Sequence, residues 1–471
     1  MCARPLSGAV EGLPAEDRFA VFSSVHRCPY KAGAPPRRVL LFSFPGAGEP
    51  NVPVSQRVFV AAAVVLSACG GGGTTIVTPP PPPPPAGFRI ILTPDAEDVV
   101  AAQALGWSAG IPGADVTLTP TDSSFPTRTV TSSATGVADF GEIASKNYIV
   151  EVRRWLTATE TARLPAGQDV DGWVARATIP AAAGASTQTL AVPASRRRSL
   201  VISEWAFNNA GFPGIGDYPF GGFLELYNNT DTTIYLDGMV VGEGFDSSLD
   251  APLFPCSLYA PFRNDQQGIW ARFFQLMPGS GREYPLLPGR VSVIATDAID
   301  HRSLVPGGLD LRGADFEFGG TTDADNPAVP NLTDIGRIVY PTGHGSLFGS
   351  AVAVPFVSLP VDVSSLLVGV PAGSSSNSGY ARFPADRILD AVSIGTKYLE
   401  GFADCPPLVN PRFDRAASRA RGTSNEIEEY YFSISRRVTP VLSFGRRVLQ
   451  HSRSGNADFV RTPKTPGTLP N

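Results

Sequence analysis

Histidines are the first residues in this sequence that could do acid–base or metal chemistry. After residue 68 the chain has three of them, His301, His344 and His451. None lies in an HExxH metal motif, and no strand–GxSxG–helix arrangement, phosphate-binding loop or CxxC pair accompanies them. His301 follows the stretch ATDAID, and we interpret it as a loop histidine. The histidines therefore favour no reaction, and no catalytic residue is predicted.

A run of oxygen-bearing side chains offers weak metal ligands. Asp323, Asp325 and Asn326 present oxygens at alternating positions, which could bind a calcium ion. Asp297 and Asp300 would contribute if the fold brings their loop close. The run lacks the twelve-residue loop with a terminal glutamate that EF-hand sites use. We therefore expect no cofactor, with calcium as the alternative.

Aromatic residues crowd the stretch FNNAGFPGIGDYPFGGF, residues 207–223. This segment either packs over the end of a β-domain or presents an aromatic surface to a glycan or a protein partner. In the second alternative Phe212, Tyr218 and Phe220 are the candidate binding residues.

Composition favours strands and turns over long helices. The 471 residues include 48 Gly and 45 Pro, and only 17% are charged, as in chains of short strands joined by turns. The net charge is −5, whereas nucleic-acid-binding domains usually carry an excess of basic residues. The run Arg196–Arg198 is the exception, and we interpret residues 196–199 as a solvated linker. The sequence predicts an all-β protein with no nucleic-acid partner.

A leader precedes the folded part. The apolar run Val58–Leu66 is too short to span a bilayer as a helix, which needs about 20 residues. The following Leu66-Ser67-Ala68-Cys69 resembles the lipobox of bacterial lipoproteins. The resemblance implies cleavage after Ala68 and a lipid on Cys69; a secretory signal with a coincidental cysteine is the alternative. Residues 54–68 are then the signal peptide, and residues 1–53 an extension from a start codon placed too far upstream.

A tether follows the leader. Residues 69–87 begin with four glycines after the cysteine and end in seven prolines, which extend as polyproline II. Such a spacer fits a protein anchored by its N-terminal lipid to the bacterial cell envelope. Gly70 permits sorting to the outer membrane, which we expect, with the inner membrane as the alternative. Cys256 and Cys405 form a candidate disulfide, as in other exported chains.

Residues 88–195 alternate apolar and polar side chains over several strand-length segments. The order GADVTL … TVTSSATGVADFGEIASKNYIVEV resembles the carboxypeptidase regulatory-like (transthyretin-like) β-sandwich. The resemblance places Gly136 in a turn with positive φ, Phe140 in the core and Tyr148 at the start of the last strand. It implies a non-catalytic spacer or adhesion module.

Residues 200–471 form the second predicted module. The stretches LVISEW, GGFLELYNNTD and IYLDG resemble the lamin-tail immunoglobulin-like fold. The match is closer to the lipoprotein family called domain of unknown function 4876, through REYPLLPGRVSVIATDAIDH (282–301), LDLRGADFEFGGTTDADNPAVPNL (309–332) and the ending GRRVLQHSRSGNADFVRTPKTPG (445–467). Trp205 departs from the small or aliphatic residue common at its position. A second β-sandwich with long loop insertions follows.

Glu204 and Glu225 come from strands that neighbour each other in a lamin-tail-like sheet. Paired carboxylates can do acid–base work, but acids at strand ends commonly accept hydrogen bonds from backbone amides or an arginine. We favour this structural interpretation. The prediction is a lipid-anchored, non-enzymatic binding or adhesion protein, an accessory of an outer-membrane receptor or a binder of a surface polymer. A calcium-dependent hydrolase or nuclease accessory and a purely structural envelope spacer are the alternatives.

Overall fold

The computed structural model describes residues 87–122, 124–180, 186–197, 200–206, 210–218, 220–244, 260–320, 325–339, 354–370, 379–396, 408–421 and 430–469. These residues are mostly β-strand, in several sheets, which confirms the predicted all-β class. The helices among them are a few residues long, and none has the length and apolar character needed to cross a membrane.

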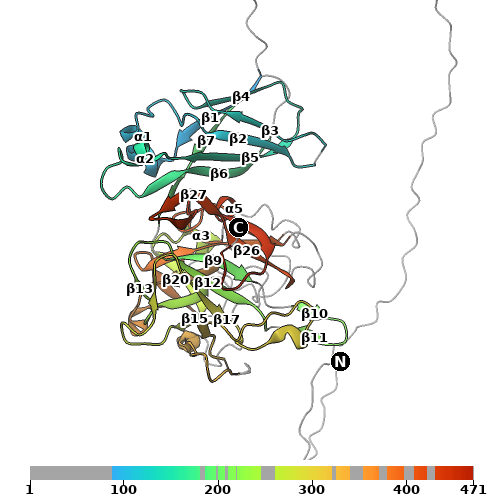
Figure 1. The fold of residues 1–471 in the computed structure, drawn as a ribbon, viewed down its shortest axis with the longest axis vertical. Coiled ribbons are helices and arrows are strands. Elements are labelled where there is room, and N and C mark those ends of the chain that lie inside the picture. The colour runs from blue at the N-terminus through green and yellow to red at the C-terminus, as the bar shows by residue number, and fades with distance from the viewer. Residues whose placement is uncertain are drawn as a thin grey trace, which may run out of the picture. The chain divides into compact units, whose positions relative to one another are not determined.

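The first module is a sandwich of two sheets, drawn as separate layers in Figure 1. Its elements are β1 (Phe88–Pro94), η1 (Ala96–Asp98), α1 (Val99–Ala104), β2 (Asp115–Pro120), β3 (Arg128–Thr131), β4 (Val137–Gly141), β5 (Asn147–Trp155), α2 (Ala158–Thr161), β6 (Val170–Pro180), β7 (Thr187–Val192) and β8 (Ala194–Arg196). One sheet has the order β4-β1-β7 and the other the order β3-β2-β5-β6-β8. β1 runs parallel to β7, whereas the other pairs are antiparallel.

Strand alternation builds the core of this module. On β2 the side chains of Val116 and Leu118 are buried, whereas those between them are partly exposed, so one face of the strand points inward. Phe140 is buried in the same core, as predicted. Gly136 has a φ of 78°, and a Cβ there would lie 2.7 Å from the backbone nitrogen of Ile111. The predicted glycine turn is therefore confirmed by both conformation and space.

The arginines at the end of this module are not a solvated linker, so that interpretation is wrong in part. Arg196 belongs to β8 and forms an ion pair with the buried Asp98. Arg197 lies 2.5 Å from the buried carboxylate of Asp171. Both guanidiniums offset the cost of burying an acid. The arginine run does not predict these ion pairs, because the acids Asp98 and Asp171 lie far away in the sequence.

Among the described residues, the second module has two larger sheets and four two-stranded sheets, and Figure 1 shows several of their strands. Its strands are β9 (Leu200–Ala206), β10 (Ala210–Phe212), β11 (Gly216–Tyr218), β12 (Phe223–Asn228), β13 (Ile234–Tyr235), β14 (Val240–Gly244), β15 (Gly268–Leu276), β16 (Pro285–Leu286), β17 (Val291–Ala295), β18 (Phe316–Glu317), β19 (Thr333–Asp334), β20 (Val354–Ser358), β21 (Leu367–Gly369), β22 (Tyr380–Pro384), β23 (Ile388–Ala391), β24 (Ile394–Thr396), β25 (Ser418–Arg421), β26 (Phe432–Arg436), β27 (Val438–Ser443), β28 (Arg446–Leu449) and β29 (Phe459–Pro463). Its short helices are α3 (Ala260–Asn264), η3 (His301–Ser303), η4 (Gly336–Ile338), η5 (Val363–Ser365) and α5 (Gly455–Asp458).

The larger sheets have the orders β18-β17-β12-β9-β26-β29 and β21-β22-β15-β14-β20-β23, with β19 paired to β15. One apolar cluster joins them, with Trp205 and Leu224 from the first sheet and Val241, Phe273 and Val357 from the second. Trp205, unusual for the resembled family, is fully buried there. β9, β12 and β17 lie where the sequence predicts them, because each is an apolar run between turn residues.

Candidate functional site

Glu204 and Glu225 come from neighbouring strands, as predicted, and the structure shows further that they are direct cross-strand partners. β9 and β12 are antiparallel neighbours, and the two glutamates face each other in the register. Both side chains are fully buried. Two carboxylates held side by side in a core are the arrangement that general acid–base sites use, so their hydrogen-bond partners decide their role.

The partners of both acids belong to the scaffold. Glu204 accepts hydrogen bonds from the hydroxyl of Ser433 at 2.5 Å, and from the backbone N–H and the hydroxyl of Thr465 at 2.9 and 2.8 Å. Glu225 accepts from the hydroxyl of Ser203 and from the backbone N–H of Gly467, both at 2.7 Å. The pair therefore fastens the C-terminal segment, residues 464–469, across β9 and β12.

Burial controls the protonation of this pair. It raises the pKa of Glu225 to about 8, with the Ser203 hydrogen bond opposing and the charge of Glu204 adding to the rise. The pKa of Glu204 is also raised by burial, against hydrogen bonds from Ser433 and Thr465. Beside them, burial lowers the pKa of Lys464 to about 7, whereas Glu204 acts to raise it. The Lys464 amine donates to the carbonyl of Gly221 at 3.2 Å, so it too holds the C-terminal segment.

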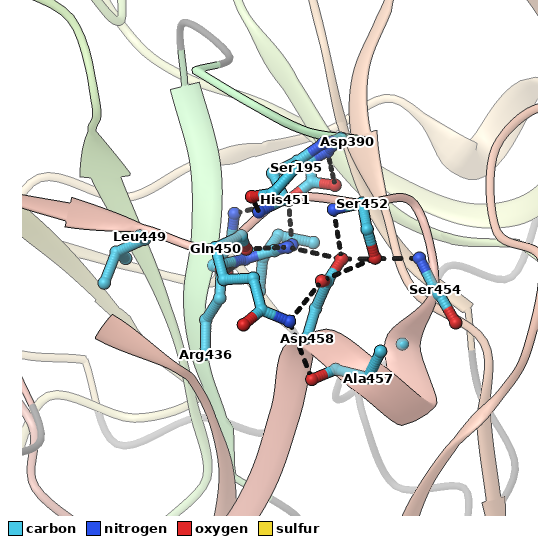
Figure 2. A network of polar contacts seen from close by, with 12 residues as sticks. Ser195, Asp390, Arg436, Leu449, Gln450, His451, Ser452, Ser454, Ala457 and Asp458 are labelled. Atoms are coloured by element: carbon cyan, nitrogen blue, oxygen red, sulfur yellow. Dashed lines mark hydrogen bonds and ion pairs between the residues drawn. The ribbon is translucent and has the colours of Figure 1, made fainter. Parts of the chain in front are cut away.

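A second buried polar cluster, shown in Figure 2, is centred on Arg436. Its guanidinium donates to the carbonyl oxygens of Ile202 at 2.7 Å and Gln450 at 3.1 Å. It also lies 2.5 Å from the carboxylate of Asp390 and 3.5 Å from that of Asp458. Arg436, Asp390 and Asp458 are each at most 2% exposed. The Arg436 guanidinium lies between the two carboxylates and neutralises charges that would be costly to bury unpaired.

Each carboxylate of this cluster has further donors (Figure 2). Asp458 accepts from the backbone and the hydroxyl of Ser452, both at 2.8 Å, and from the side-chain amide of Gln450 at 3.0 Å. Asp390 accepts from the backbone N–H of Ile202 at 2.8 Å. Burial acts to raise the pKa of Asp390, but the charges of Arg436 and His451 and the hydrogen bond from Ile202 together outweigh burial and hold this pKa below its ordinary value. Asp390 therefore stays ionised.

His451 joins this cluster to the first module. Its Nε2 lies 3.1 Å from Asp390 Oδ1, and its backbone N–H donates to the Ser195 hydroxyl at 3.1 Å. Its carbonyl oxygen accepts from the backbone N–H of Arg196 at 2.8 Å. An Asp–His pair resembles part of a hydrolase triad, but among the described residues no hydroxyl or thiol bonds to the ring's Nδ1 atom, which is buried. The backbone of His451 therefore joins the cluster to the first module.

A cavity of about 130 Å³ adjoins the pair. It is lined by Ala385, Ile388, Leu389, Asp390, Ala391, Arg412, Phe413, His451 and Arg453. The lining arginines are engaged with the chain itself. Arg412 donates to the carbonyl of Gln266 at 2.7 Å, and Arg453 donates to the carbonyl of Arg412 at 3.1 Å and pairs with Glu97.

The aromatic surface predicted from Phe212, Tyr218 and Phe220 is not present as an exposed surface. Phe212 is 4% and Tyr218 9% exposed, and Phe220 packs partly buried against them in a cluster with Val305 and Tyr430. These rings therefore pack against the chain itself, in one cluster with Val305 and Tyr430.

His301 also has a structural role. Its Nδ1 lies 2.6 Å from the Tyr218 hydroxyl, and its Nε2 lies 2.9 Å from the carbonyl oxygen of Asp297. Burial lowers the pKa of His301, so the ring is neutral at pH 7. It lies in η3 and is fully buried, which its loop interpretation did not include.

The calcium ligands predicted from sequence do not converge within the described residues. Asp325 accepts from the side-chain amide of Asn331 at 2.5 Å, and the Asn326 side-chain oxygen accepts from the backbone of Ala328 at 3.1 Å. Asp300 pairs with Arg302 at 2.6 Å. In the described ranges no group of three or more His, Cys, Asp or Glu could hold a metal ion. The described side chains bond to the chain itself, and the calcium alternative stays a prediction. Asp323 lies outside the described residues.

Several other predicted residues also lie outside the described ranges. They are the signal cleavage position Ala68, the lipidation candidate Cys69, His344, and the disulfide candidates Cys256 and Cys405. Those calls stay predictions.

The Arg436 cluster is the feature that sequence reasoning missed. β26 reads FSISR, and Ile434 lies in the core, so a period of two places Arg436 on the same inward face. An arginine at an inward position of an apolar strand signals a buried ion pair. Its partner Asp390 carries no such local signal, because it lies 46 residues away.

The described residues form a β-protein of two modules, with buried polar clusters beside the apolar core of the second module. Part of the second module matches a family model. Residues 287–465 match the family model described as "Protein of unknown function (DUF4876)". This match confirms the predicted DUF4876 domain for those residues. No curated protein matches the chain.

Two solved structures are similar to the chain. One is a DUF4876 family protein from Bacteroides thetaiotaomicron VPI-5482, with 17% identity and a TM-score of 0.46, covering 82% of this chain and 96% of that one. The other is a DUF3823 family protein from Bacteroides uniformis ATCC 8492, with 9% identity and a TM-score of 0.14, covering 64% of this chain and 96% of that one. Neither similarity carries an argument about function.

Proposed function

We propose that this protein is a lipid-anchored envelope protein whose β-modules bind a partner without catalysing a reaction. The proposal that the protein catalyses no reaction rests on the hydrogen bonds that the buried acids accept. Glu204, Glu225, Asp390 and Asp458 all accept hydrogen bonds from the chain's own backbone, hydroxyl or guanidinium groups. Acids used in this way stabilise the fold and are not positioned toward a substrate.

The anchor rests on the sequence around Cys69. A nine-residue apolar run, small residues at positions 67 and 68, and a Gly/Pro-rich tether together support acylation of this thiol. The outer membrane is the proposed location. A receptor in that membrane or a surface polymer is the proposed partner.

Mass spectrometry of the protein purified from its native membrane tests the anchor. We expect a mature chain that begins at Cys69 and carries acyl groups. Cys69→Ala should move the protein from the membrane pellet to the soluble fraction. An unmodified thiol, or a variant that stays in the pellet, would contradict the anchor.

The enzyme alternative is tested with a panel of ester, nucleic-acid and glycoside substrates, each with and without calcium. We expect no turnover by the full chain above a heat-denatured control. Calcium-dependent turnover that Asp325→Ala abolishes would overturn the non-enzymatic proposal.

Chemical crosslinking on intact cells, followed by detergent extraction, separates a binding role from a spacer role. A stoichiometric crosslink to one receptor or one polymer supports binding. Crosslinks that do not exceed those of an unrelated lipoprotein would favour the spacer.

A further inference from the structure

The hairpin of β27 and β28 presents its apolar side to solvent. Leu442 is 61% and Phe444 86% exposed, and Pro440 and Arg447 are also exposed. Pro440 and Leu442 lie on one face of β27, Phe444 follows directly in the turn, and Arg447 is the cross-strand partner of Leu442. We call this set, Pro440, Leu442, Phe444 and Arg447, the hairpin face. β27 is labelled in red in Figure 1.

The opposite side of the hairpin is docked on the protein. Thr439, Ser443 and Val448 are buried. The Ser443 hydroxyl lies 3.0 Å from Asp231 and 2.9 Å from a nitrogen of Arg197. Because the hairpin is anchored on this side, the apolar residues of the hairpin face project from a fixed support.

The tip of the hairpin adopts a conformation that phenylalanine disfavours. Phe444 has a φ of 48° and Gly445 a φ of 76°, the signature of a two-residue turn with both residues in the left-handed region. Asparagine or glycine occupies the first of these positions at lower cost. A large aromatic ring that is both strained and exposed indicates a contact outside the chain.

The charge of the hairpin indicates what that contact is. Residues 437–449 contain Arg437, Arg446 and Arg447 and no acidic residue. Asp231 pairs with Arg446. Burial and the charges of Arg153 and Arg176 lower the pKa of Arg437, whereas the charges of Glu151 and Asp458 act to raise it. The charged side chains of the hairpin itself are therefore all basic and lie beside an apolar tip, the combination that binds an anionic bilayer surface.

We propose that the hairpin face inserts into the headgroup layer of an anionic membrane, with Phe444 and Leu442 as the inserted side chains. The proposal rests on the proposed lipid anchor for its location. If Cys69 is lipidated, residues 70–87 span at most about 65 Å at 3.3–3.6 Å per residue, which keeps the folded body near the bilayer. A short apolar tip suits shallow insertion, because the hairpin's ladder pairs its own backbone groups.

Vesicle sedimentation with the mature-length chain, residues 69–471 carrying Cys69→Ala, tests the hairpin without the lipid and without the apolar leader. We expect binding to phosphatidylglycerol/phosphatidylcholine vesicles, weaker binding to pure phosphatidylcholine, and loss of binding at high salt. Leu442→Ser/Phe444→Asn should lower the partition coefficient at least about tenfold. Arg447→Ser should lower it by about fivefold.

A control variant and a stability measurement separate loss of the hairpin face from loss of folding. Phe125→Ser removes an aromatic residue that is 48% exposed on a loop of the first module, and we expect unchanged vesicle binding. The melting temperature of the double variant should be no lower than that of its parent, because asparagine relieves the turn. Vesicle binding that the double variant retains would overturn the proposal, as would no binding by the parent.

The two proposals fail separately. Vesicle binding by the Cys69→Ala chain, together with an unmodified thiol in the native protein, would contradict the lipid anchor and support insertion of the hairpin face. A lipidated thiol with no vesicle binding would support the lipid anchor and contradict insertion.

Discussion

The Glu204–Glu225 pair and the Asp390–Arg436–Asp458 cluster both bury carboxylates in the second module, and their protonation differs. Glu225 receives only neutral donors, and burial raises its pKa to about 8. Asp390 receives a guanidinium, and its pKa stays below the ordinary value in spite of complete burial. Asp414 follows the first pattern. Three backbone N–H groups bind it, and burial raises its pKa to about 7.

This contrast shows that burial alone does not set the charge of an acid. Neutral donors hydrogen-bond to a carboxylate but do not compensate the loss of hydration of its charge. A guanidinium hydrogen-bonds to the carboxylate and also supplies an opposite charge that stabilises the ionised form. Raised carboxyl pKa values are a common guide to catalytic sites. Here the raised values at Glu204 and Glu225 mark acids that fasten the C-terminal segment.

Removing the cation should have the largest effect. Arg436→Met leaves Asp390 and Asp458 buried without their counter-charge, and we expect it to lower the free energy of unfolding by about 3–5 kcal/mol. Urea denaturation measures this loss. The control Arg337→Met removes a side chain that is 53% exposed and should cost at most about 1 kcal/mol. Equal losses for the two variants would remove the distinction between the clusters.

Stability should respond to pH through Glu225. Its folded pKa of about 8 lies above the ordinary value of 4.5, so between these values the folded state binds the extra proton. Its contribution is full below about pH 4.5 and is lost as pH rises through 8, by at most about 1.4 kcal/mol per pH unit. Glu225→Gln should flatten this fall in urea titrations between pH 5 and 8. Glu142→Gln, at an exposed position, should leave it unchanged. Asp414, whose pKa burial raises to about 7, should still contribute part of the slope. A slope in Glu225→Gln equal to that of the parent would assign the proton elsewhere.

The hydrogen bonds of the C-terminal segment should have a moderate effect. Thr465→Val removes the hydroxyl that donates to Glu204 and should cost about 1 kcal/mol. Hydrogen exchange at residues 464–469 should quicken in this variant. Thr468→Val, an exposed change on the same segment, serves as the control. Equal exchange in both variants would mean that Glu204 does not hold the segment.

The smallest effect has the opposite sign. Phe444→Asn replaces a strained residue with one that favours the left-handed region, and should raise the free energy of unfolding by about 0.5–1 kcal/mol. Leu442→Ser leaves the turn unchanged and should move it by less than about 0.5 kcal/mol. A loss of stability in Phe444→Asn would show that the ring packs on the protein.

Much of the fold could be predicted from local patterns. β9 and β12 follow from apolar runs bounded by turn residues, and Gly136 from a turn that excludes a Cβ. Their pairing followed from family resemblance, and it places Glu204 opposite Glu225 as expected. The Arg436 cluster could not be predicted in full. Its acids come from β23 and α5, and only the sheet order brings them to β26.

The sequence by itself determined where strands form, because side-chain alternation and turn chemistry act over a few residues. It also predicts a leader around Cys69, from a pattern that is equally local. Only the tertiary structure decided which carboxyl groups are charged. Asp390 and Asp414 are the same residue type, both fully buried, and their pKa values move in opposite directions. The reason is that Coulomb interaction in a low-dielectric core depends on the few ångströms to a guanidinium, and that distance is set by packing between strands far apart in the chain.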